Sequence, residues 1–148
     1  MNLDFNSQGN LHQTISLTYE EFVTHFETNA RRKQQLDNAL PFFRIFHQCG
    51  CHTVYVDGSF VSKKKYPEDI DLCFDITPVD MKKLEIEFPQ FFDINEIGTI
   101  HRDQQCHIFY FNDKDHYLLD LLSTDRDNNP KGLIKLDLRN IIHYYDQK

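Results

Sequence analysis

Apolar residues recur at helical spacing in the first third of the chain. Thr18 and Glu21 have the spacing of a capping box, so a helix is predicted to begin directly after Thr18. Residues 29–48 predict a second helix, because their apolar members lie three to four positions apart: Leu36, Leu40, Phe43 and Phe46. Pro41 is expected to kink or divide this helix, since proline has no N–H to donate.

Short apolar runs replace the helical spacing in the middle of the chain. Residues 53–56 are β-branched and aromatic and predict a buried strand, which the turn Asp57-Gly58-Ser59 ends. A short helix could then begin at Ser59 and extend to Lys65. The next apolar run predicts a second strand over residues 69–76.

Both patterns occur in the second half of the chain. Residues 78–88 predict a helix that begins at one proline and ends before another. Residues 92–100 and 105–111 are predicted to pair as strands, and residues 133–138 predict a last strand. The apolar run 118–122 fits either a helix or a strand, because so short a run has no period of its own.

The composition indicates one folded domain. A chain of 148 residues can bury about 70% of its unfolded surface. No repeat or flexible linker divides the sequence, so we predict a single α/β (α+β) domain over residues 1–148, in which the polar residues 1–16 could be loosely ordered. No apolar run is long enough for a membrane span and residues 1–10 are too polar for a signal peptide, which predicts a cytoplasmic protein.

Two aspartates give the chain its most specific chemistry. Asp69 and Asp71 flank Ile70, and alternate side chains of a strand share a face, so both carboxylates are expected on the same side. Like charges this close repel unless a cation lies between them. Mg²⁺ and Mn²⁺ are the hard cations that suit carboxylate oxygens. Asp69 and Asp71 are therefore the predicted metal ligands and catalytic residues.

The turn before the Asp pair predicts a phosphate site. Gly58 allows a ligand to approach the backbone closely, and the Ser59 hydroxyl with the free N–H groups of a short helix can bind phosphate oxygens. Lys63 is the predicted lysine contact to a triphosphate. A solvated loop is the alternative for Lys63 and for its neighbours Lys64 and Lys65.

The pattern Gly58-Ser59, nine residues, Asp69-Ile70-Asp71 resembles the signature of the polymerase-beta-type nucleotidyltransferase superfamily. That superfamily includes the minimal nucleotidyltransferases of bacterial toxin–antitoxin pairs. The resemblance runs from about Leu17 to Leu138 and looks like an uncharacterised bacterial family within the superfamily. Further residues carry it: Phe26, Asn29, Arg31-Arg32, Gly50-Cys51 and Asn129-Pro130-Lys131-Gly132. It implies a nucleotidyltransferase-like mixed sheet flanked by helices.

The resemblance also implies a reaction. A metal-dependent nucleotidyltransferase moves a nucleoside monophosphate from a triphosphate to an acceptor, which the sequence does not identify, with Mg²⁺ or Mn²⁺ on Asp69 and Asp71 and phosphates on Gly58 and Ser59. The formal charge of −7 argues against an extended nucleic acid, which normally binds a basic face. Because a domain of this size has little surface for an acceptor pocket, a protein partner or acceptor could complete the site.

Enzymes of that superfamily usually add a third acid from a later strand, and the sequence leaves its identity open. His107 lies at the expected place in the strand 105–111, where it could ligate a metal, act as a base or pack as a core histidine. Asp120 and Asp93 have the right apolar neighbours. One alternative is a degenerate fold that binds a partner without turnover, such as a toxin–antitoxin component. Another is a phosphate-ester hydrolase with the same acid pair.

Two other clusters of reactive side chains have structural explanations. Residues 47–52 hold two histidines and two cysteines, but their spacing does not fit a zinc site, so free and packed thiols are predicted. Residues 31–33 are basic and could form either a salt-bridged helix face or a second anion contact. The sequence does not decide between these two roles.

Overall fold

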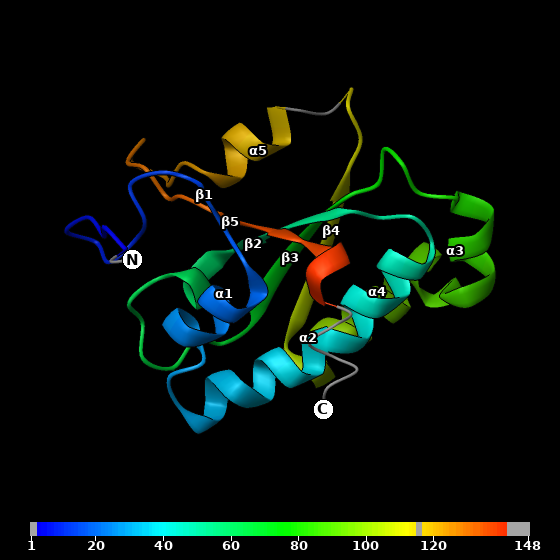
Figure 1. The fold of residues 1–148 in the computed structure, drawn as a ribbon, viewed down its shortest axis with the longest axis horizontal. Helices are drawn as coiled ribbons and strands as arrows, with labels where there is room; N and C mark the ends of the chain where they lie inside the picture. The colour runs from blue at the N-terminus through cyan, green and yellow to red at the C-terminus, as the bar shows by residue number, and fades with distance from the viewer. Residues whose placement is uncertain (1–2, 115–116, 142–148) are drawn as a thin grey trace.

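A five-stranded mixed sheet forms the centre of the molecule (Figure 1). The computed structural model describes residues 3–114 and 117–141. The strands of that part are β1 (Ile15–Leu17), β2 (Thr53–Asp57), β3 (Ile70–Asp75), β4 (Cys106–Phe111) and β5 (Ile134–Asp137). They lie in the order β1-β5-β2-β3-β4. β1 is parallel to β5 and β3 is parallel to β4, whereas β2 is antiparallel to both β3 and β5.

Helices lie on both sides of this sheet. In Figure 1, α2 crosses below the strands and α5 lies above them. The labelled α-helices are α1 (Tyr19–Phe26), α2 (Ala30–Gln48), α3 (Met81–Glu87), α4 (Ile94–Gln104) and α5 (Tyr117–Leu122), and residues 138–141 are also helical. The described part of the chain also forms two 3-10 helices, η1 (Gly58–Val61) and η2 (Pro89–Phe92). The predicted α/β class, a mixed sheet flanked by helices, is confirmed.

Side-chain caps begin the first two helices where the sequence predicts them. The Thr18 hydroxyl accepts a hydrogen bond from the Glu21 N–H (3.1 Å), and the Glu21 carboxylate accepts one from the Thr18 N–H (2.9 Å). The Asn29 side chain caps α2 by accepting from the Arg32 N–H (2.9 Å). Of the two effects expected of Pro41, a kink or a division, the division does not occur: α2 is one continuous helix, with core packing on both sides of the proline.

The main core lies between α2 and the sheet. The Phe46 ring of α2 stacks on Phe74 of β3, with 3.8 Å between the ring centroids. Alternate residues of β2, β3 and β4 are buried in the core: Val54, Val56, Ile70, Leu72, Cys106 and Ile108. Because side chains alternate along a strand, the residues between them project from the opposite face of the sheet. That face carries Asp57, Asp71 and His107.

Residues 92–100 do not form the predicted strand, because η2 and α4 occupy them. The Asp93 carboxylate explains the difference: it accepts hydrogen bonds from two backbone N–H groups of the first helical turn (2.9 and 3.4 Å) and so begins α4. The predicted strand at 105–111 is confirmed as β4, but its partner is β3. The ambiguous run 118–122 lies in the helix α5.

The segment before β1 packs against regions that are distant in sequence. Leu11 is fully buried, and its carbonyl oxygen accepts a hydrogen bond from the Gly132 N–H (2.8 Å). The Asn6 side chain donates to the carbonyl of residue 130 (2.8 Å). The Gly9 carbonyl accepts from the Lys63 N–H (2.9 Å). This segment therefore joins the loop after η1 to the loop before β5.

The cysteines are free and buried, as predicted. The Cys51 thiol donates to the backbone carbonyls of Thr53 (3.4 Å) and Asp75 (3.2 Å), and burial raises its pKa to about 12. A thiol with so high a pKa stays protonated near neutral pH and is a poor nucleophile. Cys51 therefore contributes to packing.

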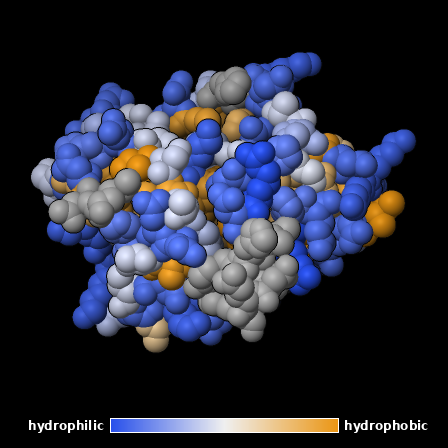
Figure 2. All heavy atoms as spheres, viewed as in Figure 1, coloured by the Kyte–Doolittle hydropathy of each residue, from blue (hydrophilic) through white to orange (hydrophobic). Residues whose placement is uncertain are grey.

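Hydrophilic residues dominate the face of the molecule in Figure 2, and hydrophobic residues appear there in small separate patches. The formal charge of the chain is −7. Among the described residues, no helix combines the length and the apolar character that crossing a bilayer requires.

Candidate functional site

Asp57, Asp71 and His107 lie side by side on three neighbouring strands. Asp57 ends β2 and is paired with Asp71 of β3, and Asp71 is in turn paired with His107 of β4. Asp69 directly precedes β3, and its carboxylate lies close to that of Asp71, as predicted for alternate residues of a strand. The Asp pair therefore has another acid on the β2 side and a histidine on the β4 side.

Two histidines face the Asp pair. His101 of α4 has its Nε2 atom 2.7 Å from Oδ2 of Asp69. His107 has its Nδ1 atom 3.8 Å from Oδ1 of Asp71. The two imidazole rings stack, with 4.2 Å between their centroids and 11° between their planes. α4 and β4 thus present one histidine to each acid of the pair.

Burial and crowding raise the pKa of two of these acids, Asp57 and Asp71. The pKa of Asp71 is raised to about 8, first because burial penalises its charged form and then because the carboxylates of Asp69 and Asp57 lie close. Burial also raises the pKa of Asp57, although the Lys131 ammonium and a backbone hydrogen bond oppose that shift. Burial and the neighbouring imidazole lower the pKa of His107. The cluster is therefore short of positive charge.

The acids fit a divalent cation. The Oδ1 atoms of Asp57 and Asp71 are buried and have no hydrogen-bond partner within the described part of the chain. A buried carboxylate oxygen without a partner is costly, and a metal ion would satisfy it. In nucleotide sites Mg²⁺ is usually held by one or two carboxylates together with phosphate oxygens and water. Within residues 3–114 and 117–141, no three His, Cys, Asp or Glu side chains are already arranged to hold a metal ion.

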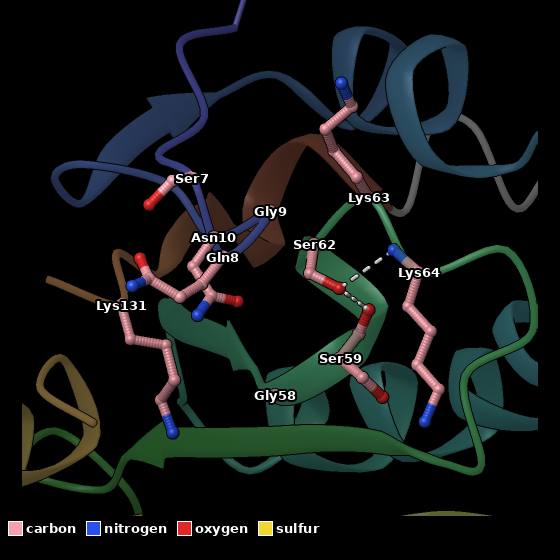
Figure 3. Close-up of a pocket in the computed structure, with 10 residues that line it drawn as sticks. All are labelled: Ser7, Gln8, Gly9, Asn10, Gly58, Ser59, Ser62, Lys63, Lys64 and Lys131. Atoms are coloured by element: carbon pink, nitrogen blue, oxygen red, sulfur yellow. Dashed lines mark hydrogen bonds between the residues drawn. The ribbon is translucent and has the colours of Figure 1, made fainter. Parts of the chain in front are cut away.

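A pocket of about 620 Å³ opens beside the Gly58-Ser59 turn (Figure 3). The turn forms one wall, and residues 7–10, residues 62–64 and Lys131 form the others. The Ser62 hydroxyl donates to the Ser59 carbonyl (2.6 Å) and accepts from the N–H of residue 64 (3.1 Å), which fixes the loop. The helix after the turn is shorter than predicted, since η1 ends at residue 61.

Three lysines line the pocket and point in different directions (Figure 3). The amino groups of Lys64 and Lys131 extend to the side of the pocket where Gly58 lies, whereas the amino group of Lys63 extends away from it. Nζ of Lys131 also lies 3.8 Å from the buried Oδ1 of Asp57. An anion beside Gly58 would therefore meet Lys64 and Lys131 more directly than Lys63.

Gly58 is the point where the turn touches the acid pair. Its φ angle of +78° is a left-handed conformation that residues with a side chain rarely adopt. A Cβ atom at this position would lie 2.5 Å from Oδ2 of Asp71. The Asp71 carboxylate can therefore lie against the turn only because residue 58 has no side chain.

A Gly58→Ala variant is expected to lose roughly 1–3 kcal/mol of unfolding free energy, because the backbone is left-handed and the new Cβ would clash with Asp71. Urea unfolding measures this loss. Gly98→Ala is the matched control: no atom lies within 4 Å of a Cβ there, and alanine should stabilise α4 by about 0.5–1 kcal/mol. Equal stability of the two variants would contradict the close contact.

Arginines at the start of α2 hold the loop that lines the pocket. Arg32 is only 3% exposed. Its guanidinium donates hydrogen bonds to the backbone carbonyls of Phe26, Phe60, Ser62 and Lys64. Arg31 donates to the carbonyl of Pro67 (2.7 Å), and Lys33 forms an ion pair with Asp37 (3.1 Å). The two arginines thus bind backbone carbonyls, a role that the sequence did not suggest.

The three candidates for the third acid lie in different places. Asp93 caps α4, and Asp120 is exposed on α5. His107 is the direct neighbour of Asp71. The structure therefore places a histidine, and neither of the two predicted acids, next to the Asp pair on β4.

Three residues of the site were not predicted from the sequence. Asp57 looks like an ordinary turn residue, although its place before Gly58 puts it beside Asp71 once β2 and β3 pair as antiparallel strands. His101 and Lys131 come from α4 and from the loop before β5. Neither has a local motif, so only the tertiary fold brings them to the acids.

Comparison with known proteins gives a family but no function. No curated protein and no solved structure matched the chain. One family matches residues 3–137, a range that includes the Asp pair, the Gly58-Ser59 turn and Lys131. The chain therefore belongs to the family of unknown function DUF6932.

Proposed function

We propose that the protein is a metal-dependent nucleotidyltransferase of the polymerase-beta type, which moves a nucleoside monophosphate from a triphosphate to an acceptor. The observation that carries this proposal is the close contact between Gly58 and Asp71, which joins the turn to the acid pair beside a lysine-lined pocket. A metal-bound triphosphate needs two kinds of contact. Carboxylate oxygens bind the cation, and N–H groups and lysines bind the phosphates.

Each side chain has a distinct task in this reaction. Asp69 and Asp71 would hold Mg²⁺ or Mn²⁺, which stabilises charge on the phosphates during transfer. The Gly58-Ser59 turn and the lysines would bind and orient the β and γ phosphates. An acceptor oxygen bonds to the α-phosphorus, the bond from that phosphorus to its bridging oxygen breaks, and pyrophosphate leaves. His107 has a lowered pKa and is neutral near pH 7, so it could take the proton of the acceptor.

The acceptor is best sought among proteins and small metabolites. The formal charge of −7 does not favour an extended nucleic acid. The pocket beside the turn has the volume of an ordinary small-molecule site, and a protein partner could supply the acceptor surface. Free buried cysteines are typical of proteins in a reducing compartment, which supports a cytoplasmic location.

A partner-binding module without turnover is the second candidate function. The observation that favours it is the register of β4, which places His107 beside Asp71 where the superfamily carries an acid. Such a module would keep the fold and the pocket but would not transfer a nucleotide.

Label transfer separates the two candidates. Purified protein is incubated with each α-labelled triphosphate and Mg²⁺ or Mn²⁺, and pyrophosphate release, self-labelling and labelling of a cell lysate are followed. The Asp69→Asn, Asp71→Asn double variant is expected to lose about 1,000-fold or more in transfer, because the cation loses its ligands. Asp103→Asn is the matched control, an exposed acid that pairs with Arg102 at the end of α4.

The results distinguish a transferase, a hydrolase and a partner-binding module. Transfer by the wild type and by Asp103→Asn, but not by the double variant, supports the enzyme. Release of free monophosphate without labelling of any acceptor would point to a hydrolase. The absence of both metal-dependent triphosphate binding and transfer would refute the proposal and favour the partner-binding module.

A further inference from the structure

We propose that Asp57 is a metal ligand of this site, so that the third carboxylate comes from β2 instead of a later strand. The inference rests on the proposed function, since it concerns the same cation. It gives a role to the buried acid that precedes Gly58 and leaves the β4 side of the Asp pair to His107.

Asp57 is buried in a way that an ordinary surface acid is not. It is 3% exposed, and its Oδ1 atom has no hydrogen-bond partner among the residues described. The nearest cation is Lys131, whose Nζ atom is 3.8 Å away and so beyond hydrogen-bond length. Since a buried carboxylate oxygen is costly without a partner, this oxygen points to a ligand.

The other carboxylate oxygen without a hydrogen-bond partner, that of Asp71, lies directly across the strand ladder. Asp57 and Asp71 are paired in the β2–β3 register, a position in which Cβ atoms are about 4.5–5.5 Å apart. Both acids have a buried Oδ1 atom without a partner in the described structure. Asp69, in contrast, is engaged by His101 at 2.7 Å. A cation on Asp71 therefore has a second carboxylate oxygen without a hydrogen-bond partner close by on the β2 side.

Lys131 links this ligand to the phosphate pocket. Its ammonium lies beside Asp57 and also lines the pocket with Gly58 and Ser59. When a divalent cation occupies Asp57, the lysine is repelled from the acid and can turn to a phosphate oxygen. Metal binding on β2 would thus prepare the pocket for the triphosphate.

Mn²⁺ binding without nucleotide tests the inference. Free Mn²⁺ is measured by electron paramagnetic resonance with the wild type, Asp57→Asn, Lys131→Met and Asp71→Asn. Asp57→Asn is expected to weaken Mn²⁺ binding about tenfold or more, because the amide can still accept the Gly58 hydrogen bond but has no charge. Lys131→Met removes the ion-pair partner of Asp57 and is not expected to weaken Mn²⁺ binding.

The outcomes separate this inference from the proposed function. Unchanged Mn²⁺ affinity in Asp57→Asn would overturn the inference, since Asp57 would then not bind the cation. Equal weakening of Mn²⁺ binding in Lys131→Met would also overturn it, since Asp57 would then act only through its ion pair. If Asp71→Asn alone loses Mn²⁺, the proposed function stands without the Asp57 ligand. A wild type that binds no Mn²⁺ also overturns the inference, and label transfer then judges the proposed function by itself.

A second measurement needs no variant. In wild-type protein with ¹³C-labelled aspartate, the carboxyl resonances of Asp57 and Asp71 are both expected to shift as Mg²⁺ is added. A shift of Asp71 with an unmoved Asp57 would overturn the inference even if Asp57→Asn failed to fold.

Discussion

An Asp71→Asn variant is expected to unfold at a higher temperature than the wild type at pH 8 in metal-free buffer. Burial and the neighbouring carboxylates of Asp69 and Asp57 raise the pKa of Asp71 to about 8, so the acid opposes folding once it is charged. Asparagine has a similar shape and carries no charge. We expect a gain on the order of 2 kcal/mol in unfolding free energy, or about 5 °C in melting temperature.

The stability gained by Asp71→Asn is expected to depend on pH. An unfolded aspartate releases its proton near pH 4, whereas folded Asp71 keeps its proton up to about pH 8. Between these values the folded state binds more protons, so this acid makes the wild type lose stability as pH rises. The stability gained by Asp71→Asn should therefore be small at pH 4 and should grow towards pH 8.

Thermal unfolding from pH 4 to pH 8 measures the effect, with Asp103→Asn as the control. Asp103 is exposed, so the control should follow the wild type at every pH. Mg²⁺ with a triphosphate should then raise the melting temperature of the wild type but not that of Asp71→Asn, because a ligand stabilises only the state that binds it. A constant difference between the two proteins at all pH values would speak against a raised pKa.

An Arg32→Met variant is expected to lose about 3–5 kcal/mol of unfolding free energy. The buried guanidinium donates to four backbone carbonyls, and its centre lies 5.0 Å from the centroid of the Phe60 ring. Methionine fills much of the same space but donates no hydrogen bond, which leaves buried carbonyl oxygens without partners. Because these carbonyls belong largely to residues 60–64, the pocket wall should loosen and triphosphate binding should weaken as well.

Chemical unfolding and triphosphate binding of Arg32→Met are compared with those of Arg31→Met. Arg31 has one hydrogen bond to the Pro67 carbonyl, so its loss should cost about 1 kcal/mol. Arg32→Lys should lie between these variants, since an ammonium keeps the charge but cannot span the same carbonyls. A similar small loss in all three variants would show that the hydrogen bonds of Arg32 are not what holds the loop.

The helix caps and the two central strands could be predicted from the sequence, because each depends on residues that are close together in the chain. Thr18 and Asn29 cap helices where their spacing indicates, and the apolar runs after His52 and before Ile76 become β2 and β3. The Gly58-Ser59 turn and the Asp pair are recognisable for the same reason, because each is a short motif. The contact between them at Gly58 and Asp71 needs only the pairing of two adjacent strands.

Other features depend on contacts that no local pattern contains. Asp93 reads equally well as a strand residue and as a helix cap, and the hydrogen bonds of its carboxylate decide for α4. Pro41 is expected to kink or divide its helix, but α2 continues through it because the burial of its neighbours outweighs the lost hydrogen bond. Lys131 reaches Asp57 from a distant part of the sequence. Such residues become visible as site residues only after the fold is complete.

The walls of the pocket also set the order in which the site can form during synthesis. Residues 7–10 are synthesised long before Lys131, which lines the same pocket, and before Gly132, whose N–H donates to the Leu11 carbonyl. Until then a nascent chain can pair β2 with β3 and expose the acids, but it has no complete cavity for a triphosphate. The proposed binding of a triphosphate would therefore need both wall segments in place, so a partly synthesised chain without residue 131 would lack it.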